Sequence, residues 1–298
     1  MKDSTIQTFS GFGFDKNGPY FIIDELKNRV ISRKKFPIID NEFTIKLLDS
    51  KYCIGRYDLR SFDSFPCPNM QLITSKENVC FECFKFNAFN PSFYNVSVNQ
   101  LSTKQREYNL SPHNVYLAYF SKNHIKVGIS HHSRNLTRWL EQGARVATIV
   151  FKCATAYEAR EIEEKISSSL NLSESFRSDQ KRLFLKDELN FENAIYLLKT
   201  LKDEIEILIN REPIESEFLN FNKQYLFDNS IQHTIIDISI DSPLIISGVG
   251  IGLIGDTLIF QNAKQQFMFS LKKFISHEIS FNTVLIKQEF TPHQTSLF

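Results

Sequence analysis

Four cysteines lie close together in the first third of the chain, at Cys53, Cys67, Cys80 and Cys83. They fall within 31 positions in the pattern C-x13-C-x12-C-x2-C, so only the last pair is tightly spaced. Zinc takes four soft ligands in a tetrahedron, with sulfur at about 2.3 Å, and a C-x2-C turn lets two sulfurs reach one ion. We predict a structural zinc site, because protein would fill all four positions.

Two alternatives for these thiols stay open. The cysteines could be unrelated buried thiols, or Cys80 and Cys83 could form a redox pair. A redox pair usually starts a helix in a thioredoxin-like unit, and that context is missing here. The fifth cysteine, Cys153, lies in an apolar run and is expected in the core.

A second reactive region is the basic, histidine-rich stretch 113–152. It holds six cations and one acid, Glu141, for a local charge of +5 (6 − 1), although the whole chain carries only +1. A local basic patch points to a phosphate-bearing partner. The cations are Lys122, Lys126, Arg134, Arg138, Arg145 and Lys152, and the histidines are His113, His124, His131 and His132.

Only one glutamate of the predicted helix 155–170 falls on its apolar face, and it is Glu163. At 100° per residue, a row of apolar side chains defines that face. An inward carboxylate is costly unless it is paired or bound to a metal. The apolar row is Ala159, Ile162, Ile166 and Leu170; Glu158 flanks it, and Glu161 and Glu164 point the other way.

These groups need elements to position them. Val115–Phe120 and Ile125–Ser130 read as two strands of a hairpin, and Val146–Cys153 as a third strand. Helices are predicted over 133–142, with Gly143 as the stop, over 155–170, and over 191–209. On the first helix, Arg134 and Arg138 lie away from the apolar face, which fits either solvated side chains or phosphate contacts.

The two ends of the chain are predicted to be β-rich. Phe9–Phe14 and Pro19–Asp24 resemble hairpin arms around the turn 15–18. Gly11, Gly13 and Gly18 recur as Gly248, Gly250 and Gly255 at a constant offset of 237. Two such hairpins could close one small barrel, or the glycines could be a chance likeness. Further strands are predicted at Thr234–Ile240, Leu244–Ile251, Thr257–Phe260, Phe267–Leu271 and Thr283–Lys287.

We therefore expect an α+β protein of four parts. These are a β-rich segment 1–50, a zinc-binding segment 51–110, an α/β domain 111–210, and a β-rich domain 211–298 that can pack with 1–50. Apolar residues make up 42% of the chain, enough for a sizeable core. No stretch has the apolar length of a membrane span and the N-terminus lacks a signal pattern, so we expect a cytoplasmic protein.

The order strand, short link, strand, helix, strand, helix resembles the GIY-YIG endonuclease superfamily, whose two triplets lie on adjacent antiparallel strands. The first triplet matches Asn114-Val115-Tyr116 and the second matches Lys126-Val127-Gly128. The resemblance implies a central three-stranded antiparallel sheet with flanking helices. It also implies an active-site arginine at Arg138, with Arg134 as the alternative, and a metal-binding glutamate at Glu163.

The chain departs from that pattern at three positions. Asn114 stands at the leading glycine of the first triplet, and Lys126 stands at the tyrosine of the second. The closing asparagine has only a loose match in Asn171. Some members carry Lys-Ile-Gly as the second triplet, so Lys126 is compatible with activity but not with the usual two-tyrosine arrangement.

A closer resemblance is to an uncharacterised bacterial family of unknown function that joins a cysteine-rich part to a GIY-YIG-like core. It spans most of the chain and informs the fold more than the activity. The matching residues are Cys53-x-Gly55, Cys67-Pro68, Cys80-x-x-Cys83, Tyr116-Leu117-Ala118-Tyr119-Phe120, Lys126-Val127-Gly128, Arg138-Trp139-x-x-Gln142-Gly143-Ala144 and Gly248-x-x-x-Gly252-x-x-Gly255.

The superfamily resemblance implies metal-dependent cleavage of a phosphodiester, with no preference between DNA and RNA. Glu163 would hold one Mg²⁺ or Mn²⁺. Tyr116 would position or deprotonate water, helped by Lys126, whose charge would lower the pKa of the phenol. Arg138 would clamp a phosphate oxygen. His132 would add an acid or base, and the substrate-binding residues would be Arg134, His131 and Tyr119, with at most one of the adjacent histidines acting.

Two other functions use the same residues. A nucleic-acid-binding protein without catalysis would need the strands and the basic face but not the carboxylate of Glu163. An enzyme of another type would act on an RNA-linked or nucleotide-like substrate, which no residue of the sequence selects.

Overall fold

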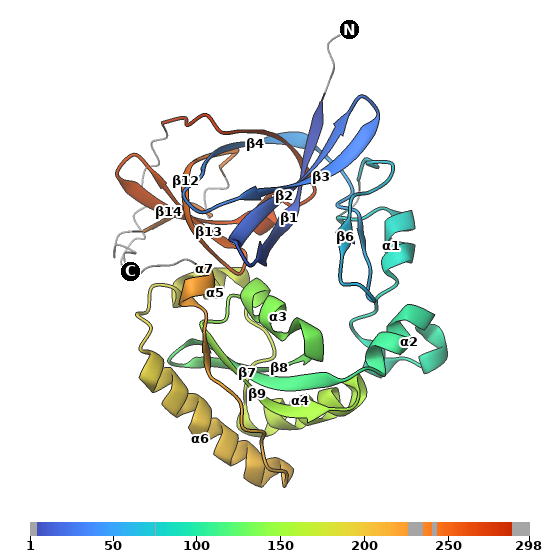
Figure 1. Ribbon diagram of the computed structural model, residues 1–298, viewed down its shortest axis with the longest axis vertical. Helices are drawn as coiled ribbons and strands as arrows, with labels where there is room; N and C mark the ends of the chain where they lie inside the picture. Colours follow the sequence, from blue (N-terminus) through green and yellow to red (C-terminus); the bar gives the residue numbers. More distant parts are fainter. Residues whose placement is uncertain (1–4, 75, 226–234, 240–242, 288–298) are drawn as a thin grey trace, which may run out of the picture. The chain divides into compact units, whose positions relative to one another are not determined.

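The computed structural model describes residues 5–74, 76–225, 235–239 and 243–287. The chain is of mixed α and β structure and divides into two compact units (Figure 1). The first comprises Met1–Gly55, Phe65–Cys80 and Gln224–Phe298, and the second comprises Arg56–Ser64 and Phe81–Lys223. This division differs from the four predicted segments, because residues 51–110 are shared between the units and residues 211–223 belong to the second.

The first unit is a nine-stranded sheet that mixes strands from both ends of the chain. Its order is β11-β14-β13-β12-β4-β15-β1-β2-β3, so β4 pairs with β12 and β15. The strands are β1 (Ile6–Asp15), β2 (Gly18–Lys27), β3 (Val30–Pro37), β4 (Glu42–Lys51), β11 (Ile236–Asp237), β12 (Ile245–Ile254), β13 (Thr257–Asn262), β14 (Gln265–Ser270) and β15 (His277–Asn282).

Phenylalanine rings fill the interior of this sheet. Phe21 meets Phe9 and Phe43 edge to face, with ring centroids 5.8 Å and 5.4 Å away, and Phe43 meets Phe260 at 5.5 Å. Phe9 and Phe43 come from one end of the chain and Phe260 from the other. The abundant phenylalanines therefore build one core from both ends, as large apolar rings do.

The segment after β3 runs along β12. The amide of Asp40 donates to the carbonyl of Gly250 (2.9 Å), and the amide of Gly250 donates to the carbonyl of Asn41 (3.1 Å). A Cβ at position 250 would lie 2.2 Å from the carbonyl oxygen of Ile38. Only glycine permits this approach. The segment that follows the edge strand β3 thereby contacts β12, an inner strand of the same sheet.

The two glycine-rich hairpins, β1–β2 and β12–β13, belong to this sheet but are not equivalent. Gly13 pairs with Tyr20, seven residues later, whereas its counterpart Gly250 pairs with Phe260, ten residues later. The turns consequently fall at different places relative to the repeated glycines. The likeness in sequence does not correspond to a repeated structure.

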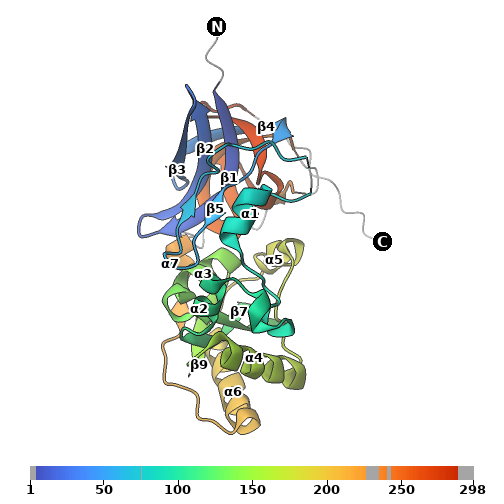
Figure 2. The same cartoon turned by 90° about the vertical axis from the view of Figure 1, so that its right-hand side faces the viewer.

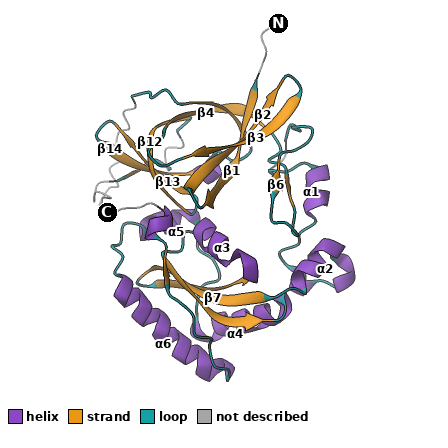
Figure 3. Cartoon of the chain, viewed as in Figure 1, coloured by secondary structure: helices purple, strands orange, loops and turns teal. Residues whose placement is uncertain are grey.

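The second unit is a four-stranded antiparallel sheet with helices (Figure 3). Its order is β10-β9-β7-β8, so the three predicted strands are present and the short β10 is added. The elements are β7 (His113–Ser121), β8 (His124–His131), β9 (Val146–Cys153), β10 (Leu219–Asn220), α1 (Phe81–Asn87), α2 (Thr103–Asn109), α3 (Asn135–Gln142), α4 (Ala156–Leu170), α5 (Ser178–Phe184), α6 (Phe191–Ile209) and part of α7 (Asn222–Tyr225). A two-stranded sheet, β5 (Arg56–Tyr57) and β6 (Ser64–Phe65), and several 3-10 turns complete the described chain.

The two faces of this sheet receive different helices. Val115 and Leu117 pack in one hydrophobic cluster with residues of α4 and α6, among them Ile166 and Leu198. Tyr116, which points the other way, packs edge to face against Trp139 of α3 at 5.6 Å. Figures 1 and 2 show α3 on one side of the strands and α4 and α6 on the other. Alternation along β7 and β8 therefore separates a core face from a second face, which carries Tyr116 and Lys126 and which we call the polar face.

Local signals explain several boundaries. Thr155 caps α4 by accepting a hydrogen bond from the amide of Glu158, and Gly143 ends α3 in the left-handed conformation at φ 79°. The predicted strand Thr283–Lys287 is wrong. The strand in this part of the chain is β15, which ends at Asn282, and residues 283–287 form no strand. Of the predicted strand 234–240, the structure gives only β11, while Thr234 and Ile240 lie outside the described residues.

Candidate functional site

Tyr116 and Lys126 lie side by side on the polar face of the second sheet. The register pairs Tyr116 with Gly128 and Ala118 with Lys126, which places both side chains on the same face. A Cβ at position 128 would lie 2.6 Å from Cζ and Oη of Tyr116 and 3.1 Å from Cε of Lys126. The glycine of the second triplet therefore makes room for the tyrosine of the first.

Lys126 is buried, with 6% of its surface exposed. Its Nζ donates to the carbonyl of Glu174 (2.9 Å). Burial and the charge of Arg138 lower the pKa of Lys126 to about 7, against the opposing effect of Glu163. An amine with such a pKa can exchange a proton at neutral pH.

Tyr116 is fully buried, and its hydroxyl donates to Oε1 of Gln142 (2.9 Å). Burial raises the pKa of Tyr116 to about 12, although Arg138 and the bond to Gln142 act in the opposite direction. This corrects the expectation that Lys126 makes the phenol more acidic. Desolvation outweighs the neighbouring charges, so Tyr116 keeps its proton at neutral pH.

Arg138 is the exposed member of this group. It projects from α3 and lies close enough to lower the pKa values of both Tyr116 and Lys126. None of the ion pairs formed by the described residues involves Arg138. The alternative arginine, Arg134, is paired with Glu141 at 3.1 Å. Arg138 is therefore the better candidate for an anionic ligand.

Glu163 is buried on α4, as its position on the apolar face predicted, and it has a partner. Its Oε2 accepts from Nη1 of Arg160 at 2.7 Å, and Arg160 also pairs with Glu174 at 2.9 Å. Burial raises the pKa of Glu163, with the hydrogen bond from Arg160 acting against it. Sequence reasoning missed Arg160, although its position three residues before Glu163 was a usable signal.

The other predicted substrate residues fall into two places. Tyr119 lies on the opposite face from Tyr116, 3% exposed within the hydrophobic cluster under α4 and α6. Its burial in the core accounts for it without a ligand, and the structure does not bring it to the group around Tyr116. His131, Arg134 and Arg138 line a pocket instead, whereas His132 is exposed and is not among the residues that line it.

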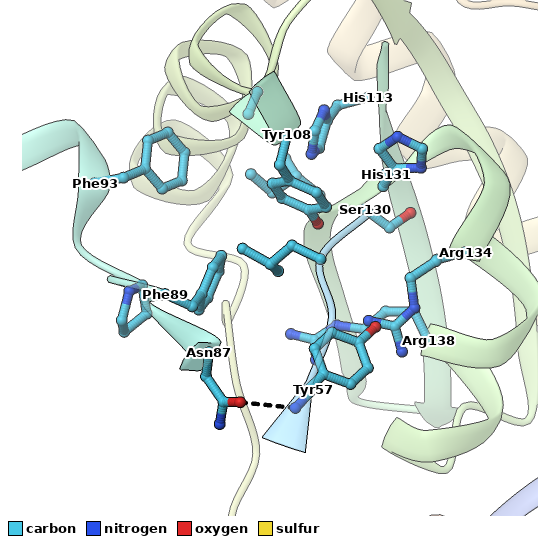
Figure 4. Close-up of a pocket in the computed structure, with 14 residues that line it drawn as sticks. Tyr57, Asn87, Phe89, Phe93, Tyr108, His113, Ser130, His131, Arg134 and Arg138 are labelled. Atoms are coloured by element: carbon cyan, nitrogen blue, oxygen red, sulfur yellow. Dashed lines mark hydrogen bonds between the residues drawn. The ribbon is translucent and has the colours of Figure 1, made fainter. Parts of the chain in front are cut away.

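We call this cavity the aromatic pocket, because its walls include Tyr57, Phe89, Phe93 and Tyr108 (Figure 4). Its volume is about 420 Å³. His131 stacks on Tyr108 at 5.4 Å, and burial together with the neighbouring His113 lowers the pKa of His131 to about 4. Segments 56–64 and 81–110 supply half of the wall, and nothing in their sequence had indicated it.

The four cysteines predicted to bind zinc come together. Their sulfur atoms all lie within 4.8 Å of one another, and Sγ of Cys67 and Sγ of Cys80 are 4.0 Å apart. A tetrahedral zinc site with bonds of about 2.3 Å separates its sulfurs by about 3.8 Å. The backbone amides of Gly55 and Cys80 donate to Sγ of Cys53, at 3.4 and 3.2 Å. This cluster could therefore hold a metal ion such as zinc.

Comparison with known proteins gives a family. Residues 41–279 match the family described as "Protein of unknown function (DUF2797)". The chain belongs to this family. The matched range takes in the four cysteines, the polar face of the second sheet and the aromatic pocket. No curated protein and no solved structure gives a significant match.

In this member of the family, the basic stretch 113–152 is less charged at its surface than its composition suggests. Lys126 and Arg145 are buried, and Nη1 of Arg145 donates to the carbonyl of Asp187 at 2.6 Å. Arg134 is offset by Glu141. The positive charge that a ligand could meet there comes chiefly from Arg138, Lys122 and Lys152, which are exposed.

The described residues contain no helix that combines the length and the apolar character needed to cross a membrane.

Proposed function

We propose that this protein is a metal-dependent nuclease of GIY-YIG type that hydrolyses phosphodiester bonds of nucleic acid at Tyr116, Lys126, Arg138 and Glu163. The observation that carries the proposal is the packing of Tyr116 and Lys126 over Gly128, with Arg138 and Glu163 close enough to change their ionisation. Grouped ionisable side chains with shifted pKa values are typical of functional sites.

Each side chain has a role that suits its surroundings. Arg138, exposed and without a carboxylate partner among the described residues, binds a phosphate oxygen. Tyr116 keeps its proton, which it donates to Gln142, and orients the attacking water by accepting a hydrogen bond from it. Lys126, with a pKa of about 7, accepts or donates the proton that moves during hydrolysis. Lys126 thus takes the role that the sequence had suggested for the tyrosine.

Glu163 offers one carboxylate to a hard cation. Its Oε2 is bonded to Arg160, and no hydrogen bond to Oε1 occurs among the described residues. Mg²⁺ commonly binds one or two carboxylates together with waters and substrate phosphates, so this donor set fits a metal that arrives with its substrate. Such an ion would stabilise negative charge on the phosphate and the leaving oxygen.

A second candidate function is nucleic-acid binding without cleavage. The observation that favours it is the ion pair between Glu163 and Arg160, which satisfies the buried carboxylate without a metal. Arg138 and the exposed lysines would then hold the phosphate backbone alone.

We further propose that the cysteine cluster holds a structural zinc ion. Cys53, Cys67 and Cys83 are buried, and the four thiols supply a full tetrahedral set, which leaves no open position for substrate. Atomic emission on the purified protein should find about one zinc per chain. A protein free of zinc and other thiophilic metals would contradict this assignment.

The nuclease proposal is tested by incubating the full chain with single-stranded DNA, duplex DNA, RNA and tRNA, each with Mn²⁺ or with chelator. We expect cleavage of at least one substrate in Mn²⁺ and none in chelator. Binding without cleavage of any of them would overturn the nuclease and support the binding protein.

A further inference from the structure

The aromatic pocket is lined entirely by residues of the second unit. Its volume of about 420 Å³ lies in the range of small-ligand pockets, about 300–1,000 Å³. Figure 4 shows the rings of Phe93, Phe89 and Tyr108 along one side and the guanidinium groups of Arg134 and Arg138 near Tyr57 on the other. One wall therefore suits a flat apolar ring and the other suits an anion.

The rings are held in place by contacts with one another. Phe89 meets Tyr108 edge to face, with ring centroids 6.1 Å apart, and Phe93 meets Tyr157 in the same way at 5.2 Å. The backbone of Tyr57 is fixed by its amide, which donates to Oδ1 of Asn87 (2.7 Å), as the dashed line in Figure 4 marks. Rigid aromatic walls bind a planar ligand with little loss of conformational entropy.

The polar groups at the pocket select for negative charge. No aspartate or glutamate is among its lining residues in the described part of the chain. The guanidinium of Arg134 lies over the ring of Tyr57, 5.4 Å from its centroid. Arg134 is itself paired with Glu141 at 3.1 Å, so the positive charge that a ligand would meet in the pocket comes chiefly from the exposed Arg138.

Arg138 connects the pocket to the proposed catalytic group. It lines the pocket and also acts electrostatically on Tyr116 and Lys126. A planar ring in the pocket would place an attached phosphate within reach of Arg138, which lines the same cavity.

We propose that the aromatic pocket binds one unpaired nucleobase of a single-stranded or looped nucleic acid and so places the adjoining phosphate at Arg138. This inference rests on the proposed function, because it names the substrate class of that same site. A base inside a duplex has both faces covered by its neighbours, whereas an unpaired base can stack on aromatic side chains. The pocket thereby selects unpaired over duplex substrates.

The test measures binding of the full chain, in chelator, by fluorescence anisotropy. The probes are a labelled single-stranded oligonucleotide, the same sequence as a duplex, and free nucleoside monophosphates as competitors. The variant is Phe89→Ala, and its matched control is Phe84→Ala, an exposed phenylalanine of the same region that does not line the pocket. Phe89→Leu keeps apolar bulk without the aromatic face, in case the alanine variant does not fold.

We expect the single strand to bind more tightly than the duplex and Phe89→Ala to weaken its binding about tenfold. Phe89→Leu should weaken it less than Phe89→Ala, and Phe84→Ala should leave it unchanged. Equal binding of duplex and single strand, or equal effects at positions 84 and 89, would overturn the inference. Absence of measurable binding of the labelled single strand would also overturn it.

Cleavage assays separate this result from the proposed function. Sensitivity of single-strand binding to Phe89→Ala without cleavage in Mn²⁺ would remove the nuclease and keep the pocket. Cleavage of single strands at the same KM and kcat by Phe89→Ala and the parent would remove the pocket and keep the nuclease.

Discussion

The cysteine cluster and the Glu163 group were both predicted to bind metal, and their surroundings differ. The cluster joins four ligands of one kind, with amides pointing at a sulfur. Glu163 is a single carboxylate that shares Arg160 with Glu174. Thiolates brought this close repel each other and gain most from a cation. The carboxylate is already balanced, so a metal there must compete with an arginine or arrive with a phosphate.

The largest difference should appear when one ligand is removed. Cys83→Ser should lose the bound metal and lower the free energy of unfolding by on the order of 5 kcal/mol, because metal binding to such a site is coupled to folding. Metal content and urea denaturation measure this. Cys153→Ala, at the buried cysteine outside the cluster, should keep the metal. Full zinc content in Cys83→Ser would show that Cys83 is not needed to hold the metal and would contradict the assignment of the cluster.

The arginine beside Glu163 should matter next. Arg160→Gln leaves the buried carboxylate with a weaker partner and should lower the free energy of unfolding by about 2–3 kcal/mol. The control is Arg211→Gln, which opens the exposed pair with Glu158 and should cost less than about 1 kcal/mol. Equal losses of unfolding free energy in urea denaturation would mean that the pair with Arg160 stabilises the protein no more than an exposed ion pair does.

The packing under Tyr116 gives a smaller effect. Gly128→Ala puts a methyl group 2.6 Å from Cζ of Tyr116 and should cost about 1–2 kcal/mol of unfolding free energy. In a Tyr116→Leu background the same change should cost less, since the two sites are in contact. Identical costs in both backgrounds would show that the tyrosine ring does not rest on Gly128.

The smallest effect is the pH dependence that Lys126 contributes. Its folded pKa of about 7 lies below its ordinary value of 10.5, so between these values the unfolded chain binds the extra proton. The contribution of neutral Lys126 to stability is complete above pH 10.5 and is lost as the pH falls toward 7. Arg138 and Lys181 face Lys126 as cations, and Glu163 and Glu174 as acids.

Between pH 7 and pH 8 the free energy of unfolding should therefore rise less in Lys126→Met than in the parent, with a difference of about 1 kcal/mol or less. Urea denaturation at the two pH values measures the difference. Parallel pH dependences for the two proteins would show that Lys126 titrates normally in the folded state.

The sequence predicted the regular elements where their pattern was strong. The strongly apolar run of β9, rich in β-branched residues, and the amphipathic period of α6 gave bounds that match the structure. β3 was missed because Arg33, Lys34 and Lys35 interrupt its alternation. The structure explains that charge in part, since Arg33 pairs with the buried Asp24 at 2.7 Å.

The candidate site was predictable where it depended on a helix face or a cross-strand pair. The inward position of Glu163 followed from the period of α4, whereas its pairing with Arg160 depends on two side chains choosing each other over solvent. The burial that sets the pKa values of Tyr116 and Lys126 is a property of tertiary packing. The aromatic pocket needed Tyr57 and Phe89, which lie in irregular segments without periodicity.

The most direct test of the proposed nuclease compares Glu163→Gln with Glu164→Gln, an exposed acid of the same helix, in a Mn²⁺-dependent cleavage assay. Both variants keep the side-chain size, and Arg160 keeps Glu174 as a partner. We predict that Glu163→Gln reduces the cleavage rate at least a hundredfold while its thermal unfolding shows a folded protein, and that Glu164→Gln cleaves like the parent. Cleavage by Glu163→Gln at the parent rate would contradict the account.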